Sequence, residues 1–93
     1  MLVVPVGSIE QHGDHLPVAT DTILVDAVAS LGAQRVTEDL PVLVTPVLWS
    51  GFSPHHLAFG GTLSLEFETM LHVVEDLADS ARENGFDALL LLN

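Results

Sequence analysis

Three short aliphatic runs, separated by two segments with helical periodicity, set the fold that this chain can adopt. The runs lie at residues 2–6, 42–48 and 88–92 and are apolar almost throughout. Continuous runs of this kind are typical of strands that are buried on both faces of a parallel sheet. Pro5 and Pro46 interrupt the first two, and proline cannot donate a hydrogen bond to a strand ladder. We therefore expect three strands of one parallel sheet.

The segments between these runs have the spacing of amphipathic helices. The first is expected from residue 22 to about residue 37, with Thr20 or Asp21 capping its start. Its apolar stripe consists of Ile23, Leu24, Ala27, Val28 and Leu31. The second stripe covers 70–81, has acidic residues on its outer face, and is followed by the helix stop Asn84-Gly85. The resulting β-α-β-α-β order implies right-handed crossovers.

Polar residues gather where the predicted strands end. Open parallel sheets bind ligands outside the carboxyl ends of their strands. The segment 10–15 follows the first strand, the segment 53–56 follows the second, and Asn93 follows the third. A further short strand is expected at 62–65. These loops predict a functional site along one edge of the sheet.

Charge and composition exclude several classes of protein. The chain has 93 residues, 13 acids, two bases and a formal net charge of −11. This balance argues against nucleic-acid binding and against an anionic membrane surface. Cysteine is absent, which excludes disulfides and thiolate chemistry. No apolar stretch approaches the roughly 20 residues that span a bilayer, and no export signal is recognisable, so we expect a cytoplasmic protein.

The densest group of chemically capable residues is the segment 10–15 together with Asp21. Carboxylate and imidazole ligands suit Zn²⁺, Mn²⁺ or Fe²⁺. Glu10 and His12 are two positions apart, so they face one point in an extended segment, to which Asp21 could return. Because a carboxylate can bridge two ions, a two-metal hydrolytic site is one interpretation. The other is a solvated acidic loop, and His15 is either a group that orients a ligand or a surface histidine.

The histidine pair His55-His56 is less specific. Neighbouring side chains of an extended segment point apart, so we do not expect these two to share a metal ion. Ser8 and Ser53 have no Gly-x-Ser-x-Gly context, which argues against a nucleophile-elbow hydrolase. No glycine-rich phosphate-binding motif is present.

Two blocks of sequence closely resemble the creatininase family of metal-dependent amidohydrolases. The first comprises residues 5–13, 15–17 and 20–21, and it resembles the N-terminal signature of that family. The second, looser block comprises residues 51–53, His56, Phe59 and Gly61-Thr62. Together with the predicted β-α-β-α-β frame, the blocks cover nearly the whole chain. The resemblance implies a three-layer α/β/α fold with a mainly parallel sheet, of which residues 1–93 are a partial domain.

The resemblance also implies a role for individual residues. Glu10 matches a ligand of one metal ion, His12 a ligand of the other, and Asp21 the carboxylate that bridges both. Ser53 and His56 are the expected substrate contacts. The implied reaction is hydrolysis of a C–N bond in a cyclic or linear small-molecule amide, in which two divalent ions activate water. Family members are often homo-hexamers, so an oligomer is expected.

The chain also departs from the family pattern. Asp14 and Gly60 stand where proline is usual, and His55 stands where glutamate is frequent. The family continues after the asparagine that matches Asn93 into a glycine and a ligand histidine. We therefore expect an N-terminal piece of a longer enzyme, inactive by itself. The alternatives are a non-catalytic relative, a relative that processes a peptide cofactor, and a mononuclear metal-binding domain.

Overall fold

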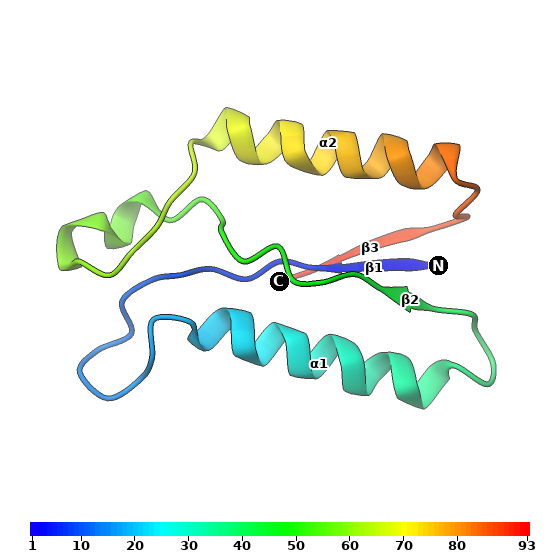
Figure 1. Cartoon of the computed structure of the whole chain (residues 1–93), viewed down its shortest axis with the longest axis horizontal. Coiled ribbons are helices and arrows are strands. Elements are labelled where there is room, and N and C mark those ends of the chain that lie inside the picture. The colour runs from blue at the N-terminus through cyan, green and yellow to red at the C-terminus, as the bar shows by residue number, and fades with distance from the viewer.

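Residues 1–93 are all described by the computed structural model, and they form a parallel sheet between two helices (Figure 1). The sheet contains β1 (Leu2–Pro5), β2 (Leu43–Val44) and β3 (Leu89–Leu92) in the order β2-β1-β3. β1 is therefore the central strand, and both neighbours run parallel to it. The predicted α/β class with a parallel sheet is confirmed.

The strand β2 is shorter than the predicted run 42–48, and the two prolines explain the difference. The carbonyl of Pro5 accepts a hydrogen bond from the backbone N–H of Leu48 at 2.9 Å, so Pro5 faces the β2 side of the sheet. Its missing N–H falls on that same side, and Pro46 lacks an N–H inside the run itself. The regular pairing of β1 with β2 consequently stops, and beyond it the two segments form only an isolated bridge between Val6 and Leu48.

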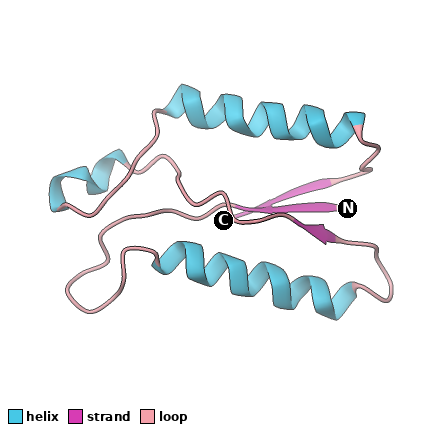
Figure 2. Cartoon of the chain, viewed as in Figure 1, coloured by secondary structure: helices cyan, strands magenta, loops and turns pink.

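Two long helices cover opposite faces of the sheet, which gives three layers (Figures 1 and 2). They are α1 (Thr20–Val36) and α2 (Phe67–Glu83), and both agree with the predicted segments to within about three residues at each end. A 3₁₀ helix, η1 (Pro54–Phe59), was not expected from the sequence. The predicted strand at 62–65 is wrong, since that segment makes only one antiparallel bridge, between Ile9 and Leu63.

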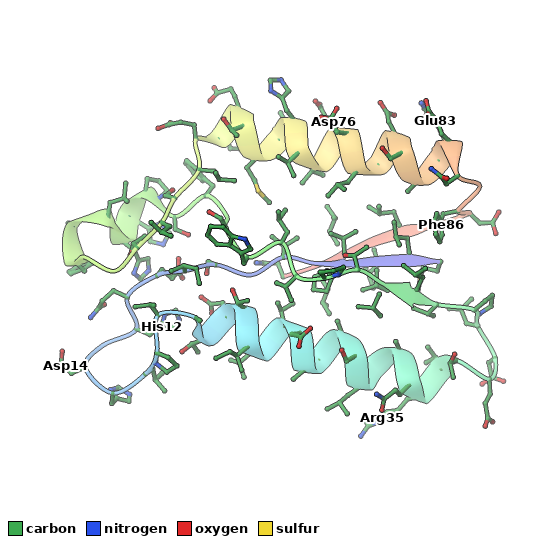
Figure 3. All side chains as sticks on the ribbon, in the orientation of Figure 1. His12, Asp14, Arg35, Asp76, Glu83 and Phe86 are labelled. Atoms are coloured by element: carbon green, nitrogen blue, oxygen red, sulfur yellow. The ribbon has the colours of Figure 1, made fainter.

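The core lies between β1 and α2. Alternation along β1 directs the side chains of Leu2 and Val4 to one face, together with Val6 just beyond the strand. They pack there against the buried Ala81 of α2. Partly buried residues complete this cluster: Leu48, Met70, Leu77, Phe86 and Leu89. The predicted apolar stripe of α2 is confirmed, and Figure 3 shows Asp76 and Glu83 on the opposite side of the helix, pointing away from the sheet.

The predicted apolar stripe of α1 does not face the sheet. Val25 and Ala29, one helical turn apart, are the buried residues of this helix. Four members of the predicted stripe are 56–58% exposed: Ile23, Leu24, Val28 and Leu31. The prediction failed because α1 is apolar around most of its circumference, so periodicity alone did not identify the packed side. A helix of this kind presents a second apolar face that other protein surface can cover.

The carboxyl ends of the strands and the long loops meet at one end of the molecule, as predicted. The loop after β1 and the segment that carries η1 extend from the same end of the sheet (Figure 1). Asn93 lies at that end too, where its side-chain amide donates a 2.9 Å hydrogen bond to the carbonyl of Val6. Neither long helix has the length and apolar character that crossing a membrane requires.

Candidate metal centre

Asp21 is held at the start of α1 by a serine at the end of β1. The hydroxyl of Ser8, which is buried, donates a 2.6 Å hydrogen bond to Asp21 Oδ2. Thr22 adds a second link, because its hydroxyl donates to the carbonyl of Ser8 at 2.9 Å. The predicted helix cap is wrong: Ala19 occupies the cap position with no side-chain bond, and the hydroxyl of Thr20 donates instead to a loop carbonyl. The Asp21 carboxylate therefore contacts Ser8 and does not cap its own helix.

Gly7 allows this close approach between strand and helix. A Cβ atom at this position would lie 2.6 Å from the hydroxyl oxygen of Thr22 and 2.7 Å from its Cα. Real Cβ atoms essentially never come so close to other heavy atoms, so any larger residue would displace the first turn of α1. The absence of a side chain at Gly7 thus sets the distance between Ser8 and Asp21.

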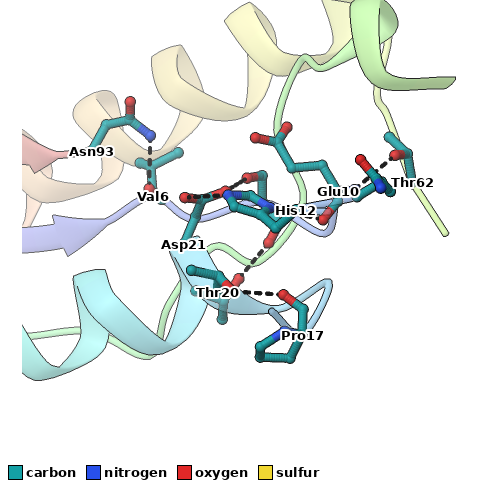
Figure 4. A network of polar contacts seen from close by, with 11 residues as sticks. Val6, Glu10, His12, Pro17, Thr20, Asp21, Thr62 and Asn93 are labelled. Atoms are coloured by element: carbon teal, nitrogen blue, oxygen red, sulfur yellow. Dashed lines mark hydrogen bonds and ion pairs between the residues drawn. The ribbon is translucent and has the colours of Figure 1, made fainter. Parts of the chain in front are cut away.

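His12 turns back toward Asp21 from the loop after β1 (Figure 4). Its Nδ1 lies 2.9 Å from the backbone carbonyl of Glu10. Because a carbonyl can only accept, Nδ1 carries a proton in this bond, and the lone pair of a neutral ring lies on Nε2. Nε2 is 3.4 Å from Asp21 Oδ1. This arrangement, in which a carbonyl fixes the tautomer and orientation of a ring, is typical of metal-binding histidines.

Glu10, His12 and Asp21 converge on one point. One ligand atom from each lies within 4.8 Å of the others, and all three residues are half-buried. The sequence predicted this convergence from the spacing of the residues, and the geometry agrees with it. Their donor set of one imidazole and two carboxylates suits Zn²⁺, Mn²⁺ or Fe²⁺. That these residues bind metal stays a prediction.

His12 and Asp21 each favour the charged form of the other. The pKa of His12 is raised, chiefly by its hydrogen bond to the carbonyl of Glu10; burial opposes the shift, and the carboxylates of Asp21 and Glu10 add to it. The pKa of Asp21 is lowered: burial is the largest influence and acts upward, but the hydrogen bond from Ser8 and the charge of His12 together outweigh it. Both shifts favour the charged forms, and His12 and Asp21 form an ion pair when the imidazole is protonated.

Two expectations about the histidines need correction. His15 is exposed and makes no hydrogen bond to the three converging residues, so Ser8 takes the orienting role that the sequence suggested for His15. His55 and His56 were expected to point apart, but they lie on η1, where successive side chains turn about the helix axis. One ligand atom from each lies within 4.8 Å of a carboxylate oxygen of Glu10. The expected direction of these two side chains was wrong because the segment was taken as extended.

A cavity of about 690 Å³ opens beside the converging residues. Its polar wall includes Glu10, Asp21, Ser53 and Asn93, and its apolar walls come from α1 and α2. His55 lines this cavity, whereas His56 does not. The structure therefore places Ser53, which is 4% exposed, where a substrate contact was expected, and it favours His55 over His56 for that role. Sequence reasoning missed the contact of Ser8 with Asp21.

Comparison with known proteins identifies the family. The creatininase family, described as creatinine amidohydrolase, matches residues 1–93. This chain belongs to the creatininase family. It is 40% identical over 86 residues to a mycofactocin precursor peptide peptidase of Mycobacterium tuberculosis, covering 86% of this chain and 34% of that protein. It is 34% identical over 98 residues to a creatinine amidohydrolase of Pseudomonas putida, covering 100% of this chain and 36% of that protein.

A solved structure agrees with these sequence matches. A mutant creatininase of Zn–Zn type superposes with a TM-score of 0.82 at 35% identity, covering 99% of this chain and 36% of that one. The creatininase-like fold is thereby shown, and hydrolases are this chain's relatives. The chain spans about a third of the length of the curated relatives it matches.

Proposed function

We propose that the whole protein is a metal-dependent hydrolase of the creatininase type, which cleaves a C–N bond in a cyclic or linear amide. The observation that carries this proposal is the convergence of Glu10, His12 and Asp21 on one point at the wall of a cavity. Family membership supports it, because the relatives include a creatinine amidohydrolase and a peptidase. Geometry and membership point to the same chemistry.

The donor atoms fit a pair of divalent ions. Asp21 offers Oδ1 on the side of His12, while Oδ2 accepts one hydrogen bond from Ser8 and keeps a second lone pair. A carboxylate presented in this way can bridge two ions, with Glu10 serving one and His12 the other. When bound, such ions supply Lewis acidity and lower the pKa of a water molecule into the neutral range. Zn²⁺, Mn²⁺ and Fe²⁺ all suit this donor set.

The residues around the centre have distinct tasks. Ser8 holds Asp21 in place, and the carbonyl of Glu10 holds the ring of His12. Ser53 lines the cavity beside them, where its hydroxyl can contact the carbonyl or the nitrogen of an amide. The mixture of apolar and polar walls suits a small organic amide better than a highly charged substrate.

Two kinds of amide are candidates. The first is a small cyclic amide, which the similarity to creatinine amidohydrolase supports at 34% identity over 98 residues. The second is an amide bond of a precursor peptide, which the 40% identity to a mycofactocin precursor peptide peptidase supports. The cavity is open enough for the end of a peptide to enter, so its shape allows both.

Turnover by the intact protein tests this function. The protein is loaded separately with Zn²⁺ and Mn²⁺ and incubated with creatinine and with short peptides that carry blocked or free ends. We expect C–N hydrolysis of one class, and its loss in Asp21→Asn. The exposed His72→Ala, on the outer side of α2, is the matched control and should keep full activity. A metal-loaded protein that cleaves no amide would instead support a non-catalytic relative.

The self-association expected from the family belongs to the same proposal. This part rests on the resemblance to a family whose members are often homo-hexamers. Sedimentation of the intact protein should show a homo-oligomer. A strictly monomeric protein would remove this part of the proposal and leave the catalytic part unaffected.

A further inference from the structure

A second group of potential metal ligands lies next to the first. It consists of Glu10, from the loop after β1, and the adjacent histidines of η1. One ligand atom from each of Glu10, His55 and His56 lies within 4.8 Å of the other two. The ring centroids of His55 and His56 are 4.4 Å apart with the planes at 65°, so the two imidazoles present different edges to this point.

The side chain of His56 has a ring nitrogen, Nδ1, that is buried and lacks a hydrogen-bond partner in the protein. Buried polar atoms are nearly always satisfied, and an unsatisfied one is expected to meet a water molecule or an ion. The rest of the residue is already fixed, because its backbone N–H donates to the carbonyl of Ser53 and its carbonyl accepts from the hydroxyl of Thr62. These bonds fix the backbone of His56, while its Nδ1 has no partner within residues 1–93 and can take a ligand.

The chemistry of the group selects the class of ligand. Two imidazoles and one carboxylate are a donor set typical of Zn²⁺ and of non-haem Fe²⁺. The formal net charge of −11 favours a cation over an anion. Glu10 has two carboxylate oxygens, so it can serve this point and the point shared with His12 and Asp21 at once. The rings of His12 and His56 lie side by side with centroids 6.4 Å apart, which makes the two points neighbours.

We propose that Glu10, His55 and His56 form a separate divalent-metal site, adjacent to the centre of Glu10, His12 and Asp21, which takes Zn²⁺ or a similar borderline ion. The site goes beyond the proposed hydrolase because it needs neither His12 nor Asp21, and it does not depend on turnover. Its occupation ties η1 to the loop after β1 and fixes His55 at the cavity wall.

The test counts Zn²⁺ ions on the intact protein with Zn²⁺ alone as the probe. Calorimetric titration and elemental analysis are applied to the wild type and to the variants His55→Ala, His56→Ala, Asp21→Asn and His72→Ala. We expect His55→Ala and His56→Ala each to lose one ion per chain, or to bind it at least tenfold more weakly. Asp21→Asn should keep that ion, and His72→Ala should match the wild type.

A direct readout keeps the proposal testable if a variant misfolds. In the Asp21→Asn protein, the imidazole nitrogens of His55 and His56 should shift in ¹⁵N spectra on addition of Zn²⁺. The proposal is overturned if both alanine variants bind Zn²⁺ in the amount and with the affinity of the wild type, or if the ring nitrogens of His55 and His56 do not move. Failure of the hydrolase proposal would be seen in the turnover assay instead, in which the wild-type protein would bind metal but cleave no amide.

Discussion

Replacing Gly7 by alanine should damage both the fold and the metal centre, and the size of the effect follows from the structure. The new Cβ would lie 2.6 Å from the hydroxyl oxygen and 2.7 Å from the Cα of Thr22. The first contact could be relieved by a rotamer change, but the second is with backbone, so the start of α1 must move. Overpacking of this kind costs about 1–3 kcal/mol, and the backbone contact places Gly7→Ala at the upper end.

A small opposing effect reduces the net cost. Gly7 is not among the glycines with positive φ, so alanine can adopt its backbone conformation. Alanine then gains about 0.4–1 kcal/mol by restricting the unfolded chain. The net loss should be about 2 kcal/mol, which corresponds to a roughly 30-fold lower folding equilibrium constant. Because Asp21 precedes Thr22, the displaced helix also moves its carboxylate, and we expect a 10- to 100-fold loss of metal affinity.

Chemical denaturation and Zn²⁺ titration of Gly7→Ala measure these two effects. The matched control is Gly32→Ala, in the exposed middle of α1, where a Cβ meets nothing within 4 Å. That substitution should stabilise the protein by about 0.5–1 kcal/mol and leave Zn²⁺ binding unchanged. The steric argument would be refuted by a Gly7→Ala protein that unfolds within about 0.5 kcal/mol of the wild type and binds Zn²⁺ equally well.

Three further predictions concern the polar contacts. Ser8→Ala removes the hydrogen bond to Asp21, so it should lower the free energy of unfolding in chemical denaturation by about 1.5–3 kcal/mol. It should also raise the pKa of Asp21 measured by NMR. An unshifted pKa would show that this bond does not hold the carboxylate. Zn²⁺ binding should release a proton from His12 at pH values below its raised pKa, and affinity should fall as pH drops through that pKa, because only the neutral ring binds metal. Calorimetry in buffers of different ionisation enthalpy measures the released proton, and its absence below the pKa would remove His12 from the ligands. Asp79→Asn breaks the ion pair with Arg82, in which the two side chains are 66% and 76% exposed. It should change the free energy of unfolding by less than about 0.5 kcal/mol. A larger change would contradict the view that this face of α2 is only solvated.

The pH dependence of the metal-free protein follows from the pair formed by His12 and Asp21. The raised pKa of His12 gives a stabilisation that is complete below the ordinary histidine pKa and is lost as pH rises through the raised value. The lowered pKa of Asp21 gives a stabilisation that is present above the ordinary aspartate pKa and is lost as pH falls through the lowered value. The pair therefore stabilises the protein most between about pH 4 and pH 6.5.

Elements with strong local patterns were predictable from the sequence. The three aliphatic runs predicted the parallel sheet, and the polar residues that follow each run predicted the edge of the sheet at which the site lies. The stripe of α2 was readable because charged residues fill its other side. The packed face of α1 was not readable, since apolar residues surround that helix and only the sheet decides which of them it covers. The prolines shortened β2 in a way that depended on which side of β1 faced it.

The candidate site was predictable where its residues are close in sequence and share an extended segment. Glu10 and His12 have that relation, and Asp21 was added because the expected start of the first helix could return it to the same point; the family resemblance then implied its bridging role. Ser8 was missed because its role depends on the approach of α1, which Gly7 permits and which no local pattern encodes. The pairing of His55 with His56 was missed because the segment forms a 3₁₀ helix, and short 3₁₀ helices have weak sequence signals.

Metal content measured together with amide hydrolysis in Asp21→Ala tests the central claim most directly. The claim is that Glu10, His12 and Asp21 hold the divalent ions with which the protein cleaves a C–N bond. The intact wild-type and variant proteins are analysed for bound metal, and their rates are measured on the amide that the wild type turns over. Asp21→Ala should lose activity together with the metal held by Glu10, His12 and Asp21, and it should keep only the ion assigned to Glu10, His55 and His56. A variant with full metal content and full rate would contradict the claim.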